Sequence, residues 1–173
     1  RDFNSRSAAN TLTLLRSRVG LEARPIEDLR VFIQGQDSRV FGQERDANGA
    51  FNTLADTRNF DLHQGYIEVK KLLVEELTLR LGRQELTYGN ERLIGAVGWN
   101  HVGRSFDGGV LRVDYPSVSI ALLAMNVGEL QAYPSNATPA SVPYIFDGGY
   151  DVYGAYATVK CVQNHKIDGY VLY

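Results

Sequence analysis

Apolar and polar residues alternate along most of the chain with a period of two. The segment 11–24 carries Leu15 and Val19 at one set of alternate positions, and Arg16 and Arg18 at the other. Successive side chains of a β-strand point to opposite faces, so this pattern predicts a strand with one aliphatic and one charged side. The alternation recurs and predicts about eight strands. They would pair as antiparallel hairpins at about residues 11–41, 60–88, 104–127 and 150–173.

The connections between these segments alternate in length. Short turns fall near residues 25–28, 72–75, 116 and 163–165. Long polar loops fall near residues 42–59, 88–104 and 128–149. Up-and-down strands with short turns at one end and long loops at the other are typical of outer-membrane β-barrels. We expect no helix beyond a single turn, for which residues 90–101 are the candidate.

Two all-β architectures fit such a pattern. In a soluble β-sandwich the aliphatic face packs inward, whereas in a membrane barrel it meets lipid and the polar face lines the lumen. Long strands, aromatic residues near strand ends and arginines in mid-strand favour the barrel. An arginine facing lipid at the bilayer midplane would cost about 2–4 kcal/mol. We therefore predict one all-β domain over residues 1–173, an antiparallel up-and-down transmembrane β-barrel, with the soluble sandwich as the alternative.

Composition narrows the class further. The 173 residues include one cysteine, Cys161, which excludes a disulfide framework. The formal net charge of −2 gives no reason to expect a nucleic-acid partner. No apolar run approaches the roughly 18 residues of a membrane-spanning helix. The chain starts abruptly at Arg1, as a processed chain would, so we expect no signal peptide in it. It ends in a strand-like segment, so we expect its C-terminal side to be incomplete.

The sequence shows no constellation of catalytic or metal-binding residues. His63, His101 and His165 are isolated, without a second ligand at a metal-binding spacing. Ser105 lacks the Gly-x-Ser-x-Gly turn of a hydrolase nucleophile. We therefore expect no enzyme, no metal and no cofactor. The aromatic residues are more typical of membrane interfaces than of sugar sites, with Trp99 in a long loop as the best exception.

Five arginines stand at polar positions of the predicted strands, opposite the aliphatic set: Arg16, Arg18, Arg30, Arg80 and Arg112. In a barrel they would face the lumen. Guanidinium groups stay charged at any working pH and fork onto carboxylates, so successive arginines suit a path for an anionic polymer. Carboxylates that pair with them would shape the constriction. We assign this role to Glu22, Glu68, Glu85, Asp107 and Asp114.

The stretch 79–113 carries a more specific signal. It contains Gly-Arg-Gln-Glu-Leu-Thr-Tyr-Gly at 82–89, Arg92-Leu93, Trp99, and Gly-Arg-Ser-Phe-Asp-Gly at 103–108. This arrangement resembles the alginate-export family of Gram-negative outer-membrane β-barrels, and the resemblance covers roughly residues 11–128. It implies a barrel of about 18 strands, of which this chain would hold fewer than half. It also implies an arginine-rich lumen that passes an anionic polysaccharide outward.

Arg83 and Arg104 lie within this motif and allow two interpretations. In the first, they line the substrate path together with the other arginines. In the second, they are structural and tie the loop 88–103 to the wall through Asp107 or Glu85. The sequence leaves both interpretations open.

The expected function is a porin-like channel in the outer membrane of a Gram-negative cell, passing anionic solutes or an alginate-like anionic polysaccharide without catalysis. Two alternatives stay open: a structural or accessory barrel in a larger outer-membrane complex, and a soluble carbohydrate-binding β-sandwich. The expected partners are the lipid bilayer with its lipopolysaccharide, the anionic polysaccharide or small anions, and periplasmic or outer-membrane subunits of a complex. No nucleic acid is expected.

Overall fold

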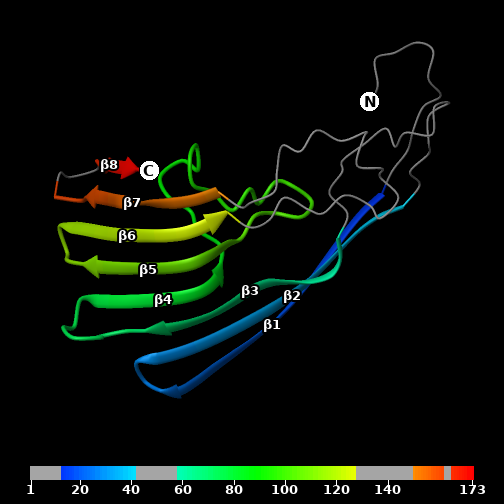
Figure 1. Cartoon of the computed structure of the whole chain (residues 1–173), viewed down its shortest axis with the longest axis horizontal. Helices are drawn as coiled ribbons and strands as arrows, with labels where there is room; N and C mark the ends of the chain where they lie inside the picture. Colours follow the sequence, from blue (N-terminus) through cyan, green and yellow to red (C-terminus); the bar gives the residue numbers. More distant parts are fainter. Residues whose placement is uncertain (1–12, 42–57, 128–149, 162–164) are drawn as a thin grey trace, which may run out of the picture.

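The part of the chain that the structure describes forms one antiparallel β-sheet. The computed structural model describes residues 13–41, 58–127, 150–161 and 165–173. Its strands are β1 (Thr13–Ile26), β2 (Leu29–Phe41), β3 (Arg58–Val69), β4 (Leu77–Gln84), β5 (Phe106–Asp114), β6 (Val118–Val127), β7 (Tyr150–Val159) and β8 (Ile167–Leu172). Each strand pairs antiparallel with the next in chain order, from β1 at one edge to β8 at the other (Figure 1). The prediction of an all-β, up-and-down architecture is confirmed.

Connections lie at both ends of the sheet. The turns after β1, β3 and β5 lie at one end, on the left of Figure 1, and the long connection from β4 to β5 lies at the other. β4 ends at Gln84, where the chain leaves the sheet, and the Tyr88 amide then donates to the Ile94 carbonyl at 3.1 Å. We call residues 85–105 the β4–β5 loop. It consists of turns and bends, without the helical turn for which residues 90–101 were the candidate.

Two of the three expected long loops fall mostly outside the residues that the structure describes. Residues 42–57 and 128–149 lie outside the described residues, whereas residues 58 and 59 already belong to β3. Within the described ranges, no helix has the length and apolar character needed to cross a membrane.

One face of the sheet, which we call the aliphatic face, is exposed. Val19 is 71 % exposed and Leu81 is 52 % exposed, whereas other large apolar side chains of this face, such as Leu79 and Leu111, are partly buried. The described residues form a single sheet, so they do not show the second sheet that would cover these side chains in a β-sandwich. Large uncovered apolar surfaces mark sites of contact with a membrane or with another protein.

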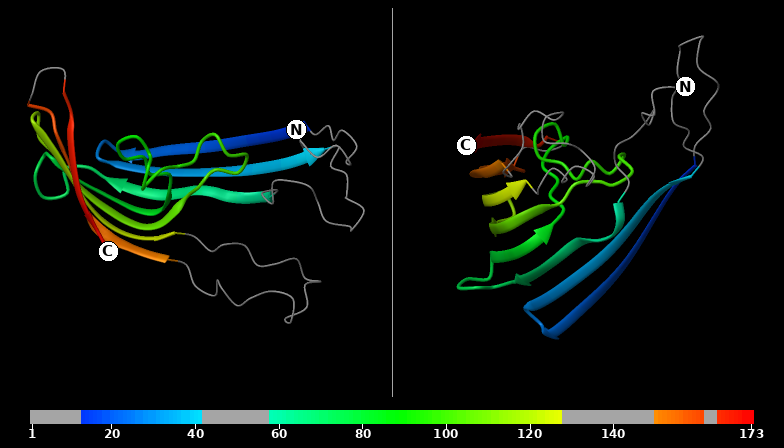
Figure 2. Two further views of the ribbon diagram at one scale, coloured as in Figure 1. Left: turned by 90° about the horizontal axis from the view of Figure 1, so that it is seen from above. Right: turned by 45° about the vertical axis from the view of Figure 1, so that its right-hand side comes forward.

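The opposite face is concave and carries the β4–β5 loop. The sheet curves so that the loop lies within its hollow (Figure 2). Leu86 and Ile94 of the loop are buried together with Phe106, Val110 and Leu123 of the sheet. This cluster is the hydrophobic core of the described fold, and it fixes the loop to the concave face.

The burial of this cluster explains why β5 and β6 also carry apolar residues on the concave face. Leu111 and Leu122 lie on the aliphatic face, whereas Val110 and Leu123 lie on the concave face beneath the loop. A sheet face in contact with water carries mostly polar residues, while a covered face stays apolar. The concave face is therefore not polar throughout, because the loop covers part of it.

Two glycines allow neighbouring strands to approach closely beside the loop. Gly82 of β4 pairs with Gly108 of β5, and their φ angles are +123° and +149°. A Cβ atom at Gly82 would lie 2.3 Å from the Gly65 carbonyl oxygen, and one at Gly108 would lie 2.2 Å from the Ala124 carbonyl oxygen. Such distances exclude a side chain, so only glycine fits at these two positions.

Candidate functional site

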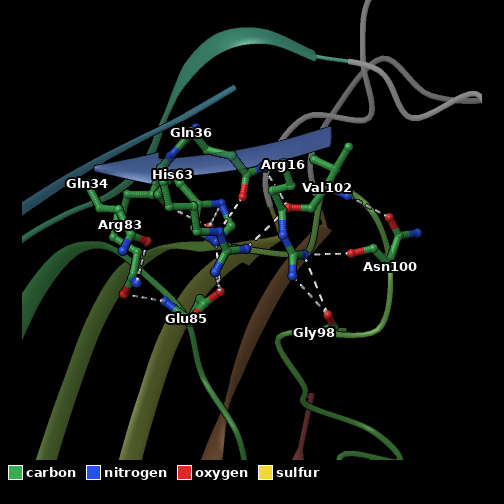
Figure 3. Close-up of polar contacts among 12 residues, drawn as sticks. Arg16, Gln34, Gln36, His63, Arg83, Glu85, Gly98, Asn100 and Val102 are labelled. Atoms are coloured by element: carbon green, nitrogen blue, oxygen red, sulfur yellow. Dashed lines mark hydrogen bonds and ion pairs between the residues drawn. The ribbon is translucent and has the colours of Figure 1, made fainter. Parts of the chain in front are cut away.

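Side chains of β1 and β2 hold the β4–β5 loop by its backbone carbonyl groups (Figure 3). Arg16 donates to the carbonyl of Asn100 at 2.8 Å and to that of Gly98 at 3.5 Å. Gln36 Nε2 donates to the carbonyl of Val102 at 2.7 Å. Carbonyl groups of a loop that is folded away from the sheet ladder need donors from elsewhere. These side chains supply them, so the far part of the loop is fixed to the first hairpin.

Glu85 joins three strands at the start of the loop. Arg18 Nη1 of β1 lies 3.0 Å from Glu85 Oε1, and His63 Nε2 of β3 lies 2.7 Å from the same oxygen. Glu85 itself directly follows β4. The hydrogen bond from His63 lowers the pKa of Glu85, partial burial opposes this, and the Arg18 charge lowers the pKa further. The carboxylate is therefore held in its charged form, which suits a group shared by two donors.

His63 reaches this site through an irregularity of β3. The register of β2 and β3 shifts between Gln34 and Gly35, which leaves His63 as an extra residue on β3. Strict alternation from Tyr66 would place His63 on the aliphatic face. A β-bulge re-aims a side chain, and here His63 is buried on the concave side, where Ser105 Oγ donates to its carbonyl at 2.5 Å.

Three other arginines of the concave face lie nearer the turn end, and each pairs with a carboxylate. The pairs are Arg30 with Glu22 at 2.7 Å, Arg80 with Glu68, and Arg112 with Asp114 at 2.5 Å. Arg30 and Arg80 also flank one aromatic ring, since their guanidinium carbons lie 5.5 Å and 4.7 Å from the centroid of Tyr66. Each guanidinium is thus held by a carboxylate, and two of them also by a ring face.

The structure places Arg83 and Asp107 on the aliphatic face, which corrects the prediction that both line the lumen with Arg80. They stand directly opposite each other in the β4–β5 register, and Arg83 Nη2 lies 2.7 Å from Asp107 Oδ2. The reason is the alternation itself. Arg80 and Gln84 occupy the concave face, so position 83 must point to the other side.

A polar row continues from this pair along the loop end of the aliphatic face. Asp107 stands opposite Asn126 of β6, and Asn126 stands opposite Asp151 of β7. Asn126 Nδ2 donates to Asp151 Oδ1 at 3.0 Å. The row therefore crosses β4 to β7 and ends the aliphatic band on that side.

Arg104 belongs to the β4–β5 loop and not to a strand. Its side chain is exposed, and its backbone amide donates to the carbonyl of Ala96 at 2.8 Å, which closes the loop on itself. This contact does not involve the guanidinium, so both interpretations of Arg104 stay predictions. The structural interpretation of Arg83 rests on its side chain, which ties the end of β4 to β5 through Asp107.

A cavity of about 140 Å³ lies on the concave face where the loop begins. Its lining includes Glu68, Arg80, Gln84, Tyr88 and Arg112. Gln84 is fully buried, and its Oε1 atom has no hydrogen-bond partner. Burial raises the pKa of Tyr88, so its hydroxyl stays protonated. The cavity has room for a few water molecules or one small polar group, to which it offers guanidinium groups and a free acceptor.

Sequence reasoning missed most of the residues that hold the loop. Ser38 Oγ donates to the His101 carbonyl at 3.3 Å, and Gln36 and His63 act as described above. The alternation pattern could have identified Gln36 and Ser38, because they stand at concave positions opposite Arg18 and Arg16. The sequence pattern could not have identified His63, because the alternation of residues does not reveal the β-bulge that places it on the concave face. The described residues contain no group of three His, Cys, Asp or Glu that could hold a metal ion.

Comparison with known proteins adds an independent finding. A family model described as alginate export matches residues 1–125, which include β1 to β5, the β4–β5 loop and most of β6. A search of curated proteins found no match. The matched region is more than half of the chain and contains both the loop and the strands that hold it. The chain therefore belongs to the alginate-export family and has a role in polysaccharide export.

Proposed function

We propose that this chain forms part of the wall of a porin-like channel in the Gram-negative outer membrane, through which an anionic polysaccharide or small anions pass without catalysis. The observation that carries the proposal is the contrast between the two faces of one sheet. The aliphatic face is uncovered, whereas the concave face carries guanidinium groups. In a membrane barrel the first would meet lipid and the second would line a water-filled lumen.

The arginines of the concave face divide into two groups under this proposal. Arg16 and Arg18 hold the loop. Arg30, Arg80 and Arg112 line the path, where their charges attract carboxylates of the passing polymer. Their pairing with Glu22, Glu68 and Asp114 keeps each site weak, because a carboxylate of the polymer must compete with one of the protein. Conduction needs binding that is weak enough to release.

The aliphatic face supports a location in the outer membrane. Large side chains such as Val19 and Leu81 are exposed on it, and the polar row that contains Arg83 and Asp107 ends the band at the loop end. Charged groups cost little near a membrane interface and much at the midplane, so the row suits the level of the lipid headgroups. We infer that the lipid bilayer and lipopolysaccharide are the partners of this face.

Ion selectivity tests the proposal. In planar bilayers, the reversal potential under a salt gradient should show that the channel prefers anions to cations. The double substitution Arg80→Glu with Arg112→Glu should lessen this preference, because it replaces two lumen cations by anions. Cation preference of the unmodified protein would contradict the anion path.

A second candidate is a structural or accessory barrel whose lumen is blocked, held in a complex with periplasmic or outer-membrane subunits. The packing of the β4–β5 loop against the concave face favours it, since the loop occupies space inside the curve of the sheet. Solute uptake into liposomes separates the two candidates. A channel admits small sugars and anions, whereas a blocked barrel admits neither.

A further inference from the structure

Two arginines of the concave face, Arg30 and Arg80, lie against one buried aromatic ring. Their guanidinium carbons are 5.5 Å and 4.7 Å from the centroid of Tyr66. Tyr66 is 6 % exposed, and its ring packs against Phe32 at a centroid distance of 5.4 Å. A buried ring cannot move aside without losing its packing, so Tyr66 offers both guanidinium groups a fixed surface.

The strand register explains how one ring reaches both arginines. Arg30 of β2 stands opposite Glu68 of β3, and Glu68 stands opposite Arg80 of β4. Tyr66 lies two residues before Glu68 and therefore on the same face of β3. It stands opposite Gly82, which has no side chain to crowd the ring. The side chain of Arg80, on the same face of β4 as Gly82, can thus lie over Tyr66.

Each of the two guanidinium groups uses only one side on a carboxylate of the protein. Arg30 contacts Glu22 through Nε and Nη2, at 2.8 Å and 2.7 Å. Arg80 contacts Glu68 through the same two atoms. Among the residues that the structure describes, neither Nη1 group has a hydrogen-bond partner. A guanidinium has several N–H donors, so each arginine keeps donors for a further acceptor.

These donors are accessible and held in place. The side chains of Arg30 and Arg80 are 28 % and 24 % exposed, so an acceptor can approach them from the concave side. A long side chain normally loses rotamer freedom when it binds a ligand. Each of these arginines is already held by a ring face and a carboxylate, so binding costs it less freedom. Guanidinium donors in a fixed arrangement suit the carboxylate group.

We propose that Tyr66 is a positioning residue for polymer binding: it holds Arg30 and Arg80 as a pair whose free N–H groups bind carboxylates of a uronate polymer. The ring of Tyr66 does not bind the carboxylates itself. It fixes where the two cations stand, and it does so through the negative face of its π-system. The proposal rests on the proposed function, because it takes the transported anionic polymer as the ligand.

Calorimetric titration with an oligomannuronate tests this role in the detergent-solubilised full-length protein. Tyr66→Leu removes the ring but leaves both arginines, so the dissociation constant should rise roughly tenfold, as expected for the loss of two cation–π contacts. Tyr66→Phe keeps the ring and should restore most of the affinity. Tyr156→Leu is the matched control, because Tyr156 is a tyrosine of the same sheet that is 8 % exposed but packs against Tyr88 and Tyr170. It should bind as the unmodified protein does.

A ring of unchanged shape separates positioning of the arginines from packing of the sheet. Pentafluorophenylalanine in place of Tyr66 fills nearly the same space as phenylalanine, but its ring face is no longer negative. This variant should fold as Tyr66→Phe does, judged by the folded band in an unheated detergent gel, and should bind the oligomannuronate as weakly as Tyr66→Leu. Equal binding by the two phenylalanine variants overturns the proposal, as does the absence of binding in the unmodified protein.

Coupling between residues gives a second test. If Tyr66 acts through Arg30, then Arg30→Gln should weaken binding less in Tyr66→Leu than in the unmodified protein. Arg112→Gln should weaken binding equally in both backgrounds, because Arg112 belongs to β5, which does not adjoin β3. Additive effects of Arg30→Gln and Tyr66→Leu would overturn the role of the ring.

The calorimetric measurement does not depend on conduction, so the outcomes separate this role from the channel proposal. Oligomannuronate binding that depends on the ring, together with cation preference in bilayers, would sustain the role of Tyr66 and contradict the anion path. Anion preference together with binding that is unaffected by the ring substitutions would sustain the channel and overturn the role of Tyr66.

Discussion

The guanidinium of Arg16 in β1 donates to the backbone carbonyl of Asn100, 84 positions further along the chain, at 2.8 Å. Together with Gln36 and Val102, these two residues join the first hairpin to the β4–β5 loop across the concave face. An arginine that stands at a lumen position of its strand thus acts on the protein itself. This contact is one of several that hold the loop on the concave face.

Replacing Arg16 should loosen the loop. Arg16→Met keeps the length of the side chain but removes the donors to the Gly98 and Asn100 carbonyls, at a cost of about 1 kcal/mol for exposed hydrogen bonds. We expect cleavage of the loop by a protease to become about fivefold faster, because cleavage follows the population of the open loop. Arg24→Met is the matched control, since Arg24 is an exposed arginine of β1 that pairs with Glu22. Equal rates in all three proteins would show that Arg16 does not hold the loop.

Acid should loosen the start of the loop, where Glu85 is bound by Arg18 and His63. The pKa of Glu85 is lowered in the folded protein, first by the hydrogen bond from His63. The charged Glu85 carboxylate therefore contributes fully to the stability of the loop above the ordinary carboxyl pKa of about 4.3. This contribution is lost as the pH falls through the lowered pKa of Glu85. Hydrogen exchange of the loop amides, measured between pH 7 and pH 3 and corrected for the intrinsic rate, should show this loss. In Glu85→Gln the pH dependence should disappear, whereas loosening as the pH rises would contradict the assignment.

Removing the partner of Arg80 should strengthen anion preference. Glu68 is buried on the concave face and pairs with Arg80, so Glu68→Gln leaves an uncompensated guanidinium beside the path. We expect the ratio of anion to cation permeability to rise roughly twofold, because the local potential becomes more positive. Glu27→Gln makes the same change of charge at the exposed β1–β2 turn and should leave the ratio unaltered. An unchanged ratio for Glu68→Gln would place Arg80 outside the ion path.

The Arg83–Asp107 pair should have no part in selectivity. Both residues stand on the aliphatic face, so the double substitution Arg83→Leu with Asp107→Leu removes no charge from the concave side. The reversal potential should stay as in the unmodified protein, in contrast to the Arg80 and Arg112 double substitution. A shift of similar size in both would mean that the two faces are not electrically separate.

Gly82 should tolerate no side chain. A Cβ atom there would lie 2.3 Å from the Gly65 carbonyl oxygen, at a φ of +123°, so Gly82→Ala should destabilise the sheet by at least about 2 kcal/mol. The temperature at which the folded band disappears in an unheated detergent gel should fall accordingly. Gly169→Ala is the control, because a Cβ atom at Gly169 meets nothing within 4 Å. Equal melting of the two variants would show that β3 and β4 can move apart at this point.

The alternation of side chains along the sequence determined the strands and their up-and-down order. It also determined the sheet face of every residue that was placed by its position in this alternation. All eight strands lie where the pattern predicts them, with ends that differ by a few residues. Arg16, Arg30 and Arg80 stand opposite the aliphatic set, as counting by two requires. Arg83 and Asp107 were placed by their motif and not by counting, and for this reason they were assigned to the wrong face. Periodicity is a local property of the backbone, so it can be read without knowing the fold.

Only the tertiary structure decided what each arginine touches. Arg16 and Arg80 look equivalent in the sequence, yet one holds a loop and the other pairs with Glu68 beside Tyr66. The difference arises because residues 85–105 leave the sheet and fold onto the concave face, and backbone carbonyls carry no mark in the sequence that assigns them a distant donor. The bulge that turns His63 toward Glu85 is likewise set by the register of two strands, which the pattern of a single strand does not contain.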